Sequence, residues 1–531
     1  MRNCCCSKNW AYVFSVLGAV LIILGGVLVV VINNFIDTTV EKDTTLVEGS
    51  TSFETWVEAP TPVYMQYYVW NLTNREEFLN GSKPAFEEVG PYTYREIRRK
   101  TNISFNDEDG TVRFYVYKAY IFDREQSVGW DNDTFSTVDL LTITFGHLMT
   151  YDDMGKYLHK LIHGGSQADF IIDVSVKGFL FGFEQPYFKF LSGLLPIELP
   201  EKYGIFYGSN DTVQEEWVVY TGQTDLSLVN QIKTWKNLTS LEYWSNEYAN
   251  MLNGTDGQAF RPYLDTTDAL YVYVPDICRS GVIEYMGPNE LRGIPTAKYS
   301  APAFQYASAE EYPDNIGFCT PDESGCTPNG LLNATECKTA PIFYSSPHFL
   351  YGSSNLLDSV IGMNPIQQQH MVDFDIETLT GVAMQVSNRL QINIRVNPLR
   401  QIREARNVHS VYFPYFWLNE SSALDEATAD FFKSDVQNLL LIADCVKAAV
   451  FSVGAGMFVG AVIIFMVRCS RVKKRRKLTD RDVITVQEEP KTDNGVINTT
   501  YDHTYQELIR RESEGPSTSG DNATAKSDEN H

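Results

Sequence analysis

The sequence predicts an α+β membrane protein in which two transmembrane helices, one near each end, flank a large ectodomain with an antiparallel sheet or barrel as its core. Three observations predict this architecture. Two long apolar stretches without charge lie near the ends of the 531 residues. Basic residues flank both stretches on the sides that face the chain ends. Between them, strand-like runs recur without the strand–helix alternation of a parallel sheet.

The first expected element is a cytoplasmic tail, residues 1–9, followed by a transmembrane helix at 10–32. Trp10–Ile32 carries no charge, and about 20 apolar residues suffice to span a bilayer. The stretch is longer than the apolar part of a cleaved signal peptide. Arg2 and Lys8 place the N-terminus in the cytoplasm. Three neighbouring cysteines are candidates for S-acylation: Cys4, Cys5 and Cys6.

The ectodomain is expected at 33–446 and consists mainly of strands. Alternating apolar and polar residues, rich in aromatic and β-branched types, predict strands at 63–73, 113–122, 215–222, 269–276 and 389–396. One segment, Thr150–His163, has helical spacing instead, with Thr150 as its cap and Gly164-Gly165 at its end. A second helical stretch is expected around Lys177–Leu195.

The second transmembrane helix is expected at 447–467. Ala448–Val467 is apolar and is followed at once by Arg468, by Arg471 and by the run KKRRK at 473–477. These charges place residues 468–531 in the cytoplasm, and the polar composition of 493–531 predicts disorder. Gly456 and Gly460 form a GxxxG spacing that predicts a close helix contact. Asp444 and Lys447 are spaced to form an ion pair at the outer end, and Cys469 is a further candidate for S-acylation.

Charge, cysteines and glycosylation motifs describe the ectodomain further. The net charge of −24 excludes nucleic acid as a natural partner. Four cysteines between residues 278 and 337 predict two disulfides in an oxidising compartment, with three pairings open. Nine N-x-S/T sequons fall in this block and predict an exposed, glycosylated domain. The predicted glycosylation sites are Asn71, Asn80, Asn102, Asn132, Asn210, Asn237, Asn253, Asn333 and Asn419.

Signatures of catalysis are missing from the sequence. It contains no HExxH, GxSxG, P-loop or CxxC motif, and its carboxylates show no telling spacing. We therefore expect no enzymatic activity, no cofactor and no metal site.

Several stretches, taken in order, resemble the class B scavenger receptor family, which includes the lysosomal integral membrane proteins. They are EEVGPYTYRE at 87–96, NMLNGTDG at 250–257, DICRS at 276–280, GFC at 317–319, SPHF at 346–349, LTG at 379–381 and FPYFWLNES at 413–421. The resemblance covers about residues 1–470. It is strongest to the lysosomal branch, because of the MLNGTDG and CRS stretches and the run of residues 50–130.

This resemblance implies an irregular antiparallel β-barrel core, a hydrophobic tunnel through it toward the bilayer, and an apical helical bundle that binds ligands. It also implies the disulfides Cys278–Cys337 and Cys319–Cys326. Surface scavengers of oxidised lipid carry lysines just after the apical helix. This chain has HGGSQADF at 163–170, without a lysine, which puts recognition of anionic particles by that route in doubt.

The apical helix supplies the ligand-binding candidates, which are Tyr151, Lys156, His159, Lys160 and His163. His159 and His163 lie one turn apart, so protonation near pH 5 would make them repel each other and would change the surface charge. This predicts a ligand contact that responds to pH. The alternative is a solvated face on which the histidines are incidental.

The C-terminal tail carries a candidate sorting signal. Tyr505-Gln-Glu-Leu508 matches YxxΦ, the form that clathrin adaptors read, so Tyr505 and Leu508 are the predicted contacts. Such a short match also occurs by chance.

Together these observations predict a receptor of lysosomal and late endosomal membranes. It would bind lipid (cholesterol, phospholipid or fatty acid) or a luminal protein cargo and would pass lipid through the ectodomain to the bilayer. The first alternative is a plasma-membrane scavenger or lipoprotein receptor of the same family. A second, from another class, is a two-pass ligand-gated channel, which the family motifs oppose. A homodimer is an open alternative for the oligomeric state.

Overall fold

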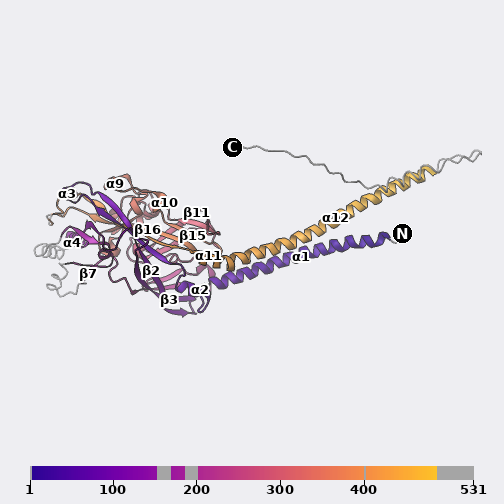
Figure 1. Cartoon of the computed structure of the whole chain (residues 1–531), viewed down its shortest axis with the longest axis horizontal. Coiled ribbons are helices and arrows are strands. Elements are labelled where there is room, and N and C mark those ends of the chain that lie inside the picture. Colours follow the sequence, from indigo (N-terminus) through magenta and orange to yellow (C-terminus); the bar gives the residue numbers. More distant parts are fainter. Residues whose placement is uncertain (1–2, 152–168, 186–200, 400–401, 403, 487–531) are drawn as a thin grey trace, which may run out of the picture. The chain divides into compact units, whose positions relative to one another are not determined.

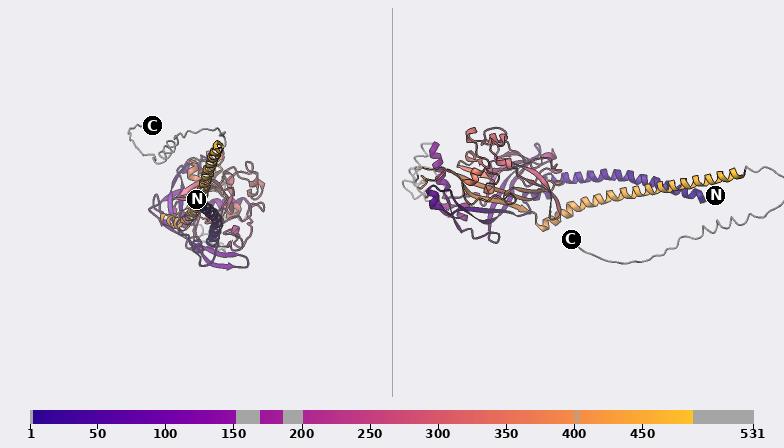
Figure 2. Two further views of the ribbon diagram at one scale, coloured as in Figure 1. Left: turned by 90° about the vertical axis from the view of Figure 1, so that its right-hand side faces the viewer. Right: turned by 90° about the horizontal axis from the view of Figure 1, so that it is seen from above.

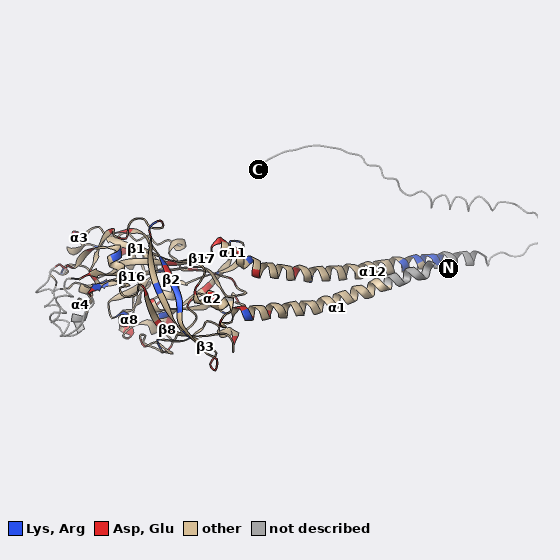
Figure 3. Ribbon diagram, turned by 60° about the horizontal axis from the view of Figure 1, so that its bottom comes forward, with Lys and Arg blue, Asp and Glu red and all other residues tan. Residues whose placement is uncertain are grey.

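Two long helices near the chain ends and a many-stranded sheet dominate the structure, a computed structural model that describes residues 3–151, 169–185, 201–399, 402 and 404–486 (Figure 1). The helices are α1 (Asn3–Thr44) and α12 (Asn438–Val486). Each contains a window that is long and apolar enough to cross a membrane. The predicted helices at 10–32 and 447–467 lie inside them. Figure 3 shows basic residues gathered in the last turns described for α12.

The chain divides into two units, Ile23–Val450 and a unit formed by Met1–Ile22 with Phe451–His531. In the second unit, α1 and α12 approach at two glycines: a Cβ added to Gly18 would lie 2.9 Å from the backbone nitrogen of Phe458 and 3.0 Å from the carbonyl oxygen of Gly454. The predicted contact at Gly456 and Gly460 is wrong, because a Cβ at either position meets no described atom within 4 Å. At 100° per residue, Gly456 points about 200° away from Gly454.

The unit Ile23–Val450 holds the strands, which gather in one body in the views of Figures 1 and 2. The strands of the first half are β1 (Val63–Leu72), β2 (Phe86–Asn106), β3 (Thr111–Asp123), β4 (Thr134–Val138), β5 (Ile171–Ser175), β6 (Phe183–Glu184), β7 (Lys202–Tyr203), β8 (Thr212–Tyr220) and β9 (Ile232–Trp235). Those of the second half are β10 (Leu270–Val274), β11 (Arg279–Leu291), β12 (Ile294–Ser300), β13 (Leu332–Asn333), β14 (Ile342–Ser345), β15 (Asp373–Ile376), β16 (Ala383–Val396) and β17 (Val411–Ala423).

Thirteen of these strands form one antiparallel sheet in the order β10-β11-β12-β15-β16-β17-β1-β2-β3-β8-β9, with β14 on β16 and β13 on β14. The predicted strands at 63–73, 113–122, 215–222, 269–276 and 389–396 correspond to β1, β3, β8, β10 and β16. The central strands β1, β16 and β17 contribute much of the core, including Tyr67, Trp70 and Phe413, all of them fully buried. The predicted antiparallel sheet is therefore confirmed.

A closed barrel is not found in the described residues, because the ladder is open between β10 and β9. The two edges nevertheless approach, since the ring of Tyr273 in β10 lies 5.8 Å from that of Trp217 in β8 and 5.3 Å from that of Trp235 in β9. A loop joins them: the N–H of Ile232 donates to the carbonyl of Gly254, and Thr255 exchanges two backbone hydrogen bonds with β10.

Glycine is required at the joint between these edges. Gly254 has φ of +88°, and a Cβ there would lie 1.9 Å from the carbonyl oxygen of Tyr271. Backbone in this region is strained for any residue with a side chain, and the overlap adds to the strain. The NGT stretch of the family motif thus joins the two ends of the sheet.

Short helices surround the sheet in Figure 1. They are α2 (Thr51–Val57), α3 (Arg75–Leu79), α4 (Leu140–Tyr151), α6 (Val176–Phe181), α8 (Thr335–Lys338), α9 (Ser354–Asp358), α10 (Gln367–His370) and α11 (Glu426–Phe432). A π-helical turn, Lys433–Gln437, joins α11 to α12. Single 3₁₀ turns lie at Leu226–Leu228, Pro275–Ile277, Ala303–Tyr306, Pro313–Phe318, Glu323–Gly325 and Pro347–Phe349.

The predicted start of the apical helix, at Thr150, is wrong. Thr150 does not cap a helix but lies in the last turn of α4, which begins ten residues earlier at Leu140. The side chain of Asp139 accepts a hydrogen bond from the N–H of Thr142 at 3.1 Å, so the start signal lies before a stretch that is mainly apolar. Residues 152–168, and 186–200 of the second predicted stretch, lie outside the described residues. Val176–Phe181 of that stretch is helical, as α6.

Candidate functional site: a charged and aromatic cavity

A cavity with a volume of about 430 Å³ lies in the unit Ile23–Val450. Its walls come from the linker between α2 and β1, from inward-facing positions of β2, β3, β8, β10, β16 and β17, and from the loop at 256–258. Ligand sites in proteins commonly have volumes of about 300–1,000 Å³. The cavity is large enough for part of a lipid.

Aromatic rings form one wall of the cavity. Trp56 packs edge-on against Phe114 with ring centroids 4.9 Å apart, and Phe114 stacks beside Trp217 at 6.3 Å. Register explains the second contact, since Phe114 of β3 and Trp217 of β8 are paired across the ladder. Trp217 in turn contacts Tyr273, so the wall reaches the joint between the sheet edges. This wall suits the apolar part of a ligand.

Charged side chains form another part of the lining, and three of them, Glu96, Arg98 and Lys100, alternate along β2 and share one face of the sheet. Figure 3 shows basic residues along this strand. The Nε atom of Arg98 lies 2.8 Å from Glu96, and its Nη2 atom lies 2.6 Å from Glu420. Lys118 is 3.7 Å from Glu96. Burial lowers the pKa of Arg98, but Glu96 and Glu420 outweigh burial and raise it above its ordinary value.

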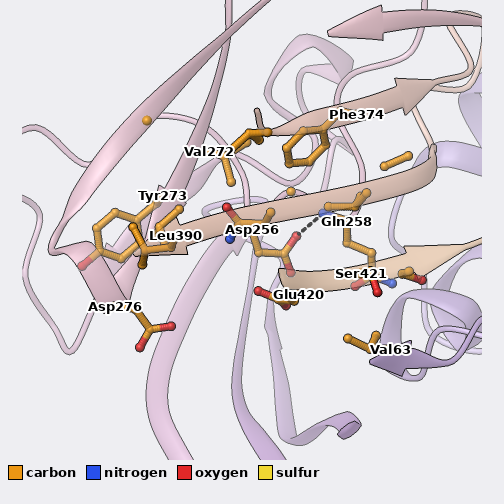
Figure 4. A pocket seen from close by; sticks show the side chains of 18 of the residues that line it. Val63, Asp256, Gln258, Val272, Tyr273, Asp276, Phe374, Leu390, Glu420 and Ser421 are labelled. Carbon is orange, nitrogen blue, oxygen red and sulfur yellow. Dashed lines mark hydrogen bonds between the residues drawn. The ribbon is translucent and has the colours of Figure 1, made fainter. Parts of the chain in front are cut away.

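Lys100 is the most enclosed cation of the lining, with 6% of its side chain exposed. Its Nζ atom donates to the carbonyl of Trp56 at 3.0 Å and to Oε1 of Gln258 at 2.6 Å, and it pairs with Asp256 at 3.2 Å. The ring of Trp56 lies 4.6 Å from the same atom. Burial lowers the pKa of Lys100, although Asp256 opposes this shift. Figure 4 shows Asp256, Gln258 and Glu420 grouped, with Val272 and Phe374 beside them.

The cavity adjoins the segments that lead to the two long helices. After α1 ends at Thr44, the chain forms α2, and the residues from the end of α2 to the start of β1, 56–63, line the cavity. Residues 420–422 at the end of β17 also line it, shortly before α11 and α12. The hydroxyl of Tyr263 donates to Asp37 of α1 at 2.7 Å, which fixes this end of α1 to the ectodomain.

A second cluster of titratable groups lies outside the cavity, where two histidine rings stack. The centroids of His348 and His370 are 4.1 Å apart with the rings nearly parallel. Nε2 of His348 lies 2.6 Å from Glu88, and this carboxylate also accepts from the indole N–H of Trp417 at 2.9 Å. Burial raises the pKa of Glu88, but these bonds outweigh it, so the pKa lies below its usual range.

A backbone N–H group donates a hydrogen bond to the Nδ1 atom of each imidazole. Nδ1 of His348 accepts from the N–H of Asn364, and Nδ1 of His370 accepts from the N–H of Ile366, each at 3.0 Å. Burial and the neighbouring His348 lower the pKa of His370 to about 4. Protonation of His370 is thus disfavoured, and a proton on its Nδ1 atom would break the bond that this atom accepts.

Comparison with known proteins decides the family. The model of the CD36 family matches residues 16–465, which is most of the chain. The chain belongs to the CD36 family. Among its relatives in the family, mouse lysosome membrane protein 2 is 33% identical over 88% of this chain and 95% of its own length. Rat lysosome membrane protein 2 is 35% identical over 83% of this chain and 91% of its own length.

Mouse scavenger receptor class B member 1 is also similar to this CD36-family chain, with 32% identity over 77% of the chain and 80% of its own length. The resemblance to the class B scavenger receptors, including the lysosomal branch, is therefore confirmed. Three family motifs contribute residues to these sites. Asp256 of NMLNGTDG and Glu420 of FPYFWLNES line the cavity, and His348 of SPHF belongs to the histidine cluster.

Few of the predicted ligand and sorting residues can be placed. Tyr151 is the last residue of α4. Lys156, His159, Lys160 and His163 lie outside the described residues, as do Tyr505 and Leu508. The acylation candidates Cys4, Cys5 and Cys6 lie in the first turns of α1, and Cys469 is exposed on α12.

The disulfides and sequons fall within the described ectodomain. Cys278 is bonded to Cys337 and Cys319 to Cys326, the pairing that the family resemblance implies. All nine sequon asparagines are exposed or partly exposed. Their amide groups differ, however: Nδ2 of Asn419 donates to Gln66 at 2.8 Å, whereas Asn237 is exposed in the turn after β9.

Sequence reasoning missed the charged lining and the histidine cluster. A signal for the first was present, since three charges in E-I-R-R-K share one face of a strand with the buried Tyr92 and Tyr94. For the second, no local signal exists, because His348, His370 and Glu88 come from distant segments that only the fold brings together.

Proposed function

We propose that this CD36-family protein is a receptor of lysosomal and late endosomal membranes that moves lipid between bound cargo and the bilayer through the ectodomain cavity. The observation that carries the proposal is the position of a partly aromatic cavity at the segments that lead to both membrane-spanning helices. The similarity to lysosome membrane protein 2 supports the compartment. The similarity to scavenger receptor class B member 1 supports the alternative of a plasma-membrane receptor.

The physical need for such a cavity is large. Burying a CH₂ group away from water is favourable by about 0.8 kcal/mol. Moving a lipid chain of roughly 16 carbons from a bilayer into water therefore costs about 12 kcal/mol. An enclosed path with an aromatic wall removes most of this barrier. Cargo would bind at the segment after α4, with His159 and His163 making the contact responsive to pH, and a clathrin adaptor would read Tyr505 and Leu508.

The topology belongs to the same proposal. Basic residues beside both apolar stretches favour cytoplasmic ends, and nine sequons between them favour a luminal ectodomain. Membership of the CD36 family leaves the two-pass channel without support. Neither an enzymatic role nor a cofactor is part of the proposal.

Filling the cavity tests the proposal. Val386 of β16 lines the cavity and is partly exposed, so Val386→Trp should occupy the path, whereas Val128→Trp adds the same ring at a position 59% exposed. Both full-length proteins are expressed in cells and given a photoreactive cholesterol analogue, and the labelled peptides are identified by mass spectrometry. Only Val386→Trp should lose most of the labelling of cavity peptides and of lipid delivery. Equal labelling in both variants would contradict transport through the cavity.

A further inference from the structure

One tryptophan of the ectodomain differs from the others. Trp130 is 60% exposed, whereas every other tryptophan whose side chain is described is at most 8% exposed. Arg124 lies over the ring, with its guanidinium carbon 5.3 Å from the ring centroid, and leaves most of the residue open. An indole of this exposure keeps a large apolar surface in water, so another group can gain by packing on it.

The turn that carries Trp130 also carries a predicted glycosylation site, Asn132. Trp130, Asn132 and Thr134 are exposed, whereas Asp131 is buried. The N–H of Asp133 donates to the carbonyl of Trp130 at 2.9 Å, and the Asp133 carboxylate accepts from the N–H of Trp130 at 3.0 Å. The turn is therefore fixed from both sides, and the indole and the Asn132 side chain both reach solvent from it.

The same spacing of aromatic residue and sequon recurs in this chain, but only here is the ring open. An aromatic residue lies two positions before the asparagine in four sequons, which are Phe78 with Asn80, Trp130 with Asn132, Trp235 with Asn237 and Trp417 with Asn419. Phe78, Trp235 and Trp417 are 0%, 4% and 5% exposed, so their rings belong to the core. A glycan at those three sites meets no aromatic face, whereas one on Asn132 does.

The chemistry of the first sugar fits this ring. N-acetylglucosamine carries its hydroxyl groups around the rim and C–H groups on its faces, and the face of an aromatic ring is negative, so it attracts such polarised C–H groups. Two residues span at most about 7 Å, which one sugar on Asn132 can bridge. Because the sugar is tethered, its effective concentration at the ring is high, and packing costs little additional freedom.

We infer that the N-glycan of Asn132 packs its first sugar on the open part of Trp130 and so becomes part of the ectodomain structure. It covers the one described ectodomain tryptophan that the protein core leaves open, and it holds the turn that leads from β3 into β4. This inference does not depend on the lipid route of the proposed function.

The test measures how well each glycan is protected in the folded protein. Full-length protein, purified from cells in mild detergent with its disulfides intact, is treated with peptide N-glycosidase F in heavy-oxygen water. The enzyme converts each released asparagine to a heavy aspartate, so mass spectrometry gives a release rate for every sequon. Trp130→Ala should speed release at Asn132 about fivefold, the effect expected of one lost ring contact. Trp130→Phe, which keeps an aromatic face, should keep most of the protection.

Two comparisons exclude a general loss of folding. Release at Asn237, whose Trp235 is buried, should be the same in all these proteins. Trp130→Ala should also lower the midpoint of thermal unfolding more in the glycosylated protein than in an Asn132→Gln background, because only the first loses the sugar contact. The inference is overturned if Asn132 carries no glycan, or if Trp130→Ala leaves its release rate unchanged. The second result would assign the open ring to a protein partner instead.

Discussion

The stacked histidines predict that acid weakens the ectodomain through His370, and the substitution His370→Asn isolates this effect. His370 is 3% exposed, and its Nδ1 atom accepts the backbone N–H of Ile366. Asparagine can present its side-chain oxygen near the same point and keep that bond, but it cannot be protonated. The variant therefore removes the titration and keeps this hydrogen bond, and the ring contacts that it loses affect stability equally at both pH values.

The magnitude follows from the pKa of about 4 in the folded protein against an ordinary value of 6.5. Because folding lowers this pKa, the unfolded chain binds the proton first as pH falls. The contribution is full above pH 6.5 and is lost as pH drops toward 4. Between pH 7.5 and pH 5 the loss is about 2 kcal/mol.

Urea unfolding of the full-length protein in detergent, with disulfides intact, measures this difference. Trp417, whose ring lies 5.8 Å from that of His370, provides a fluorescence signal close to the cluster. The loss of stability between pH 7.5 and pH 5 should be about 2 kcal/mol smaller in His370→Asn than in the native protein. His409→Asn, at an exposed histidine, serves as the control. An unchanged pH difference in His370→Asn would refute the reasoning.

Three further predictions follow from the fold and the tail. Gly254→Ala should cost about 3 kcal/mol or more, because its Cβ would overlap the carbonyl of Tyr271 at a φ of +88°; a thermal melt near that of the native protein would contradict this. Asn237→Gln should lower the apparent mass on a gel, whereas Asn419→Gln should not, because the Asn419 amide is bonded within the sheet; equal mass shifts would refute this. Tyr505→Ala should move the protein from lysosomes to the cell surface, which microscopy checks; an unchanged distribution would make the motif incidental.

The strands were the most predictable part of the fold. Alternation along β1, β3, β8, β10 and β16 is a local pattern, and each predicted strand overlaps the observed one, with the largest difference at the start of β16, 389 against 383. The start of the helix before residue 152 was missed because α4 is apolar on most faces and so lacks the periodic signal that Thr150–His163 shows. The pattern of apolar residues therefore predicts an element when one of its faces is buried. It does not predict an element that is apolar on most faces.

Contacts between distant segments were beyond the reach of sequence patterns. The GxxxG spacing drew attention to Gly456 and Gly460, but a glycine pair shows only that close approach is permitted, and the rotation of the helix places Gly454 opposite Gly18 instead. In the same way, the charges of β2 are visible in the sequence, but their partner Glu420 lies 322 residues from Arg98.

The joint between the sheet edges makes the wall of the cavity uneven in strength. Elsewhere along the order of strands, neighbours pair directly in ladders, such as the twelve paired positions between β2 and β3, which one irregularity interrupts. Between β9 and β10, by contrast, the backbone is held by three hydrogen bonds through residues 254 and 255. At about 1 kcal/mol each, parting them costs far less than unzipping a ladder. The cavity wall is therefore weakest beside Trp217 and Tyr273. There the two sheet edges can separate for a bulky ligand while every strand pair stays intact.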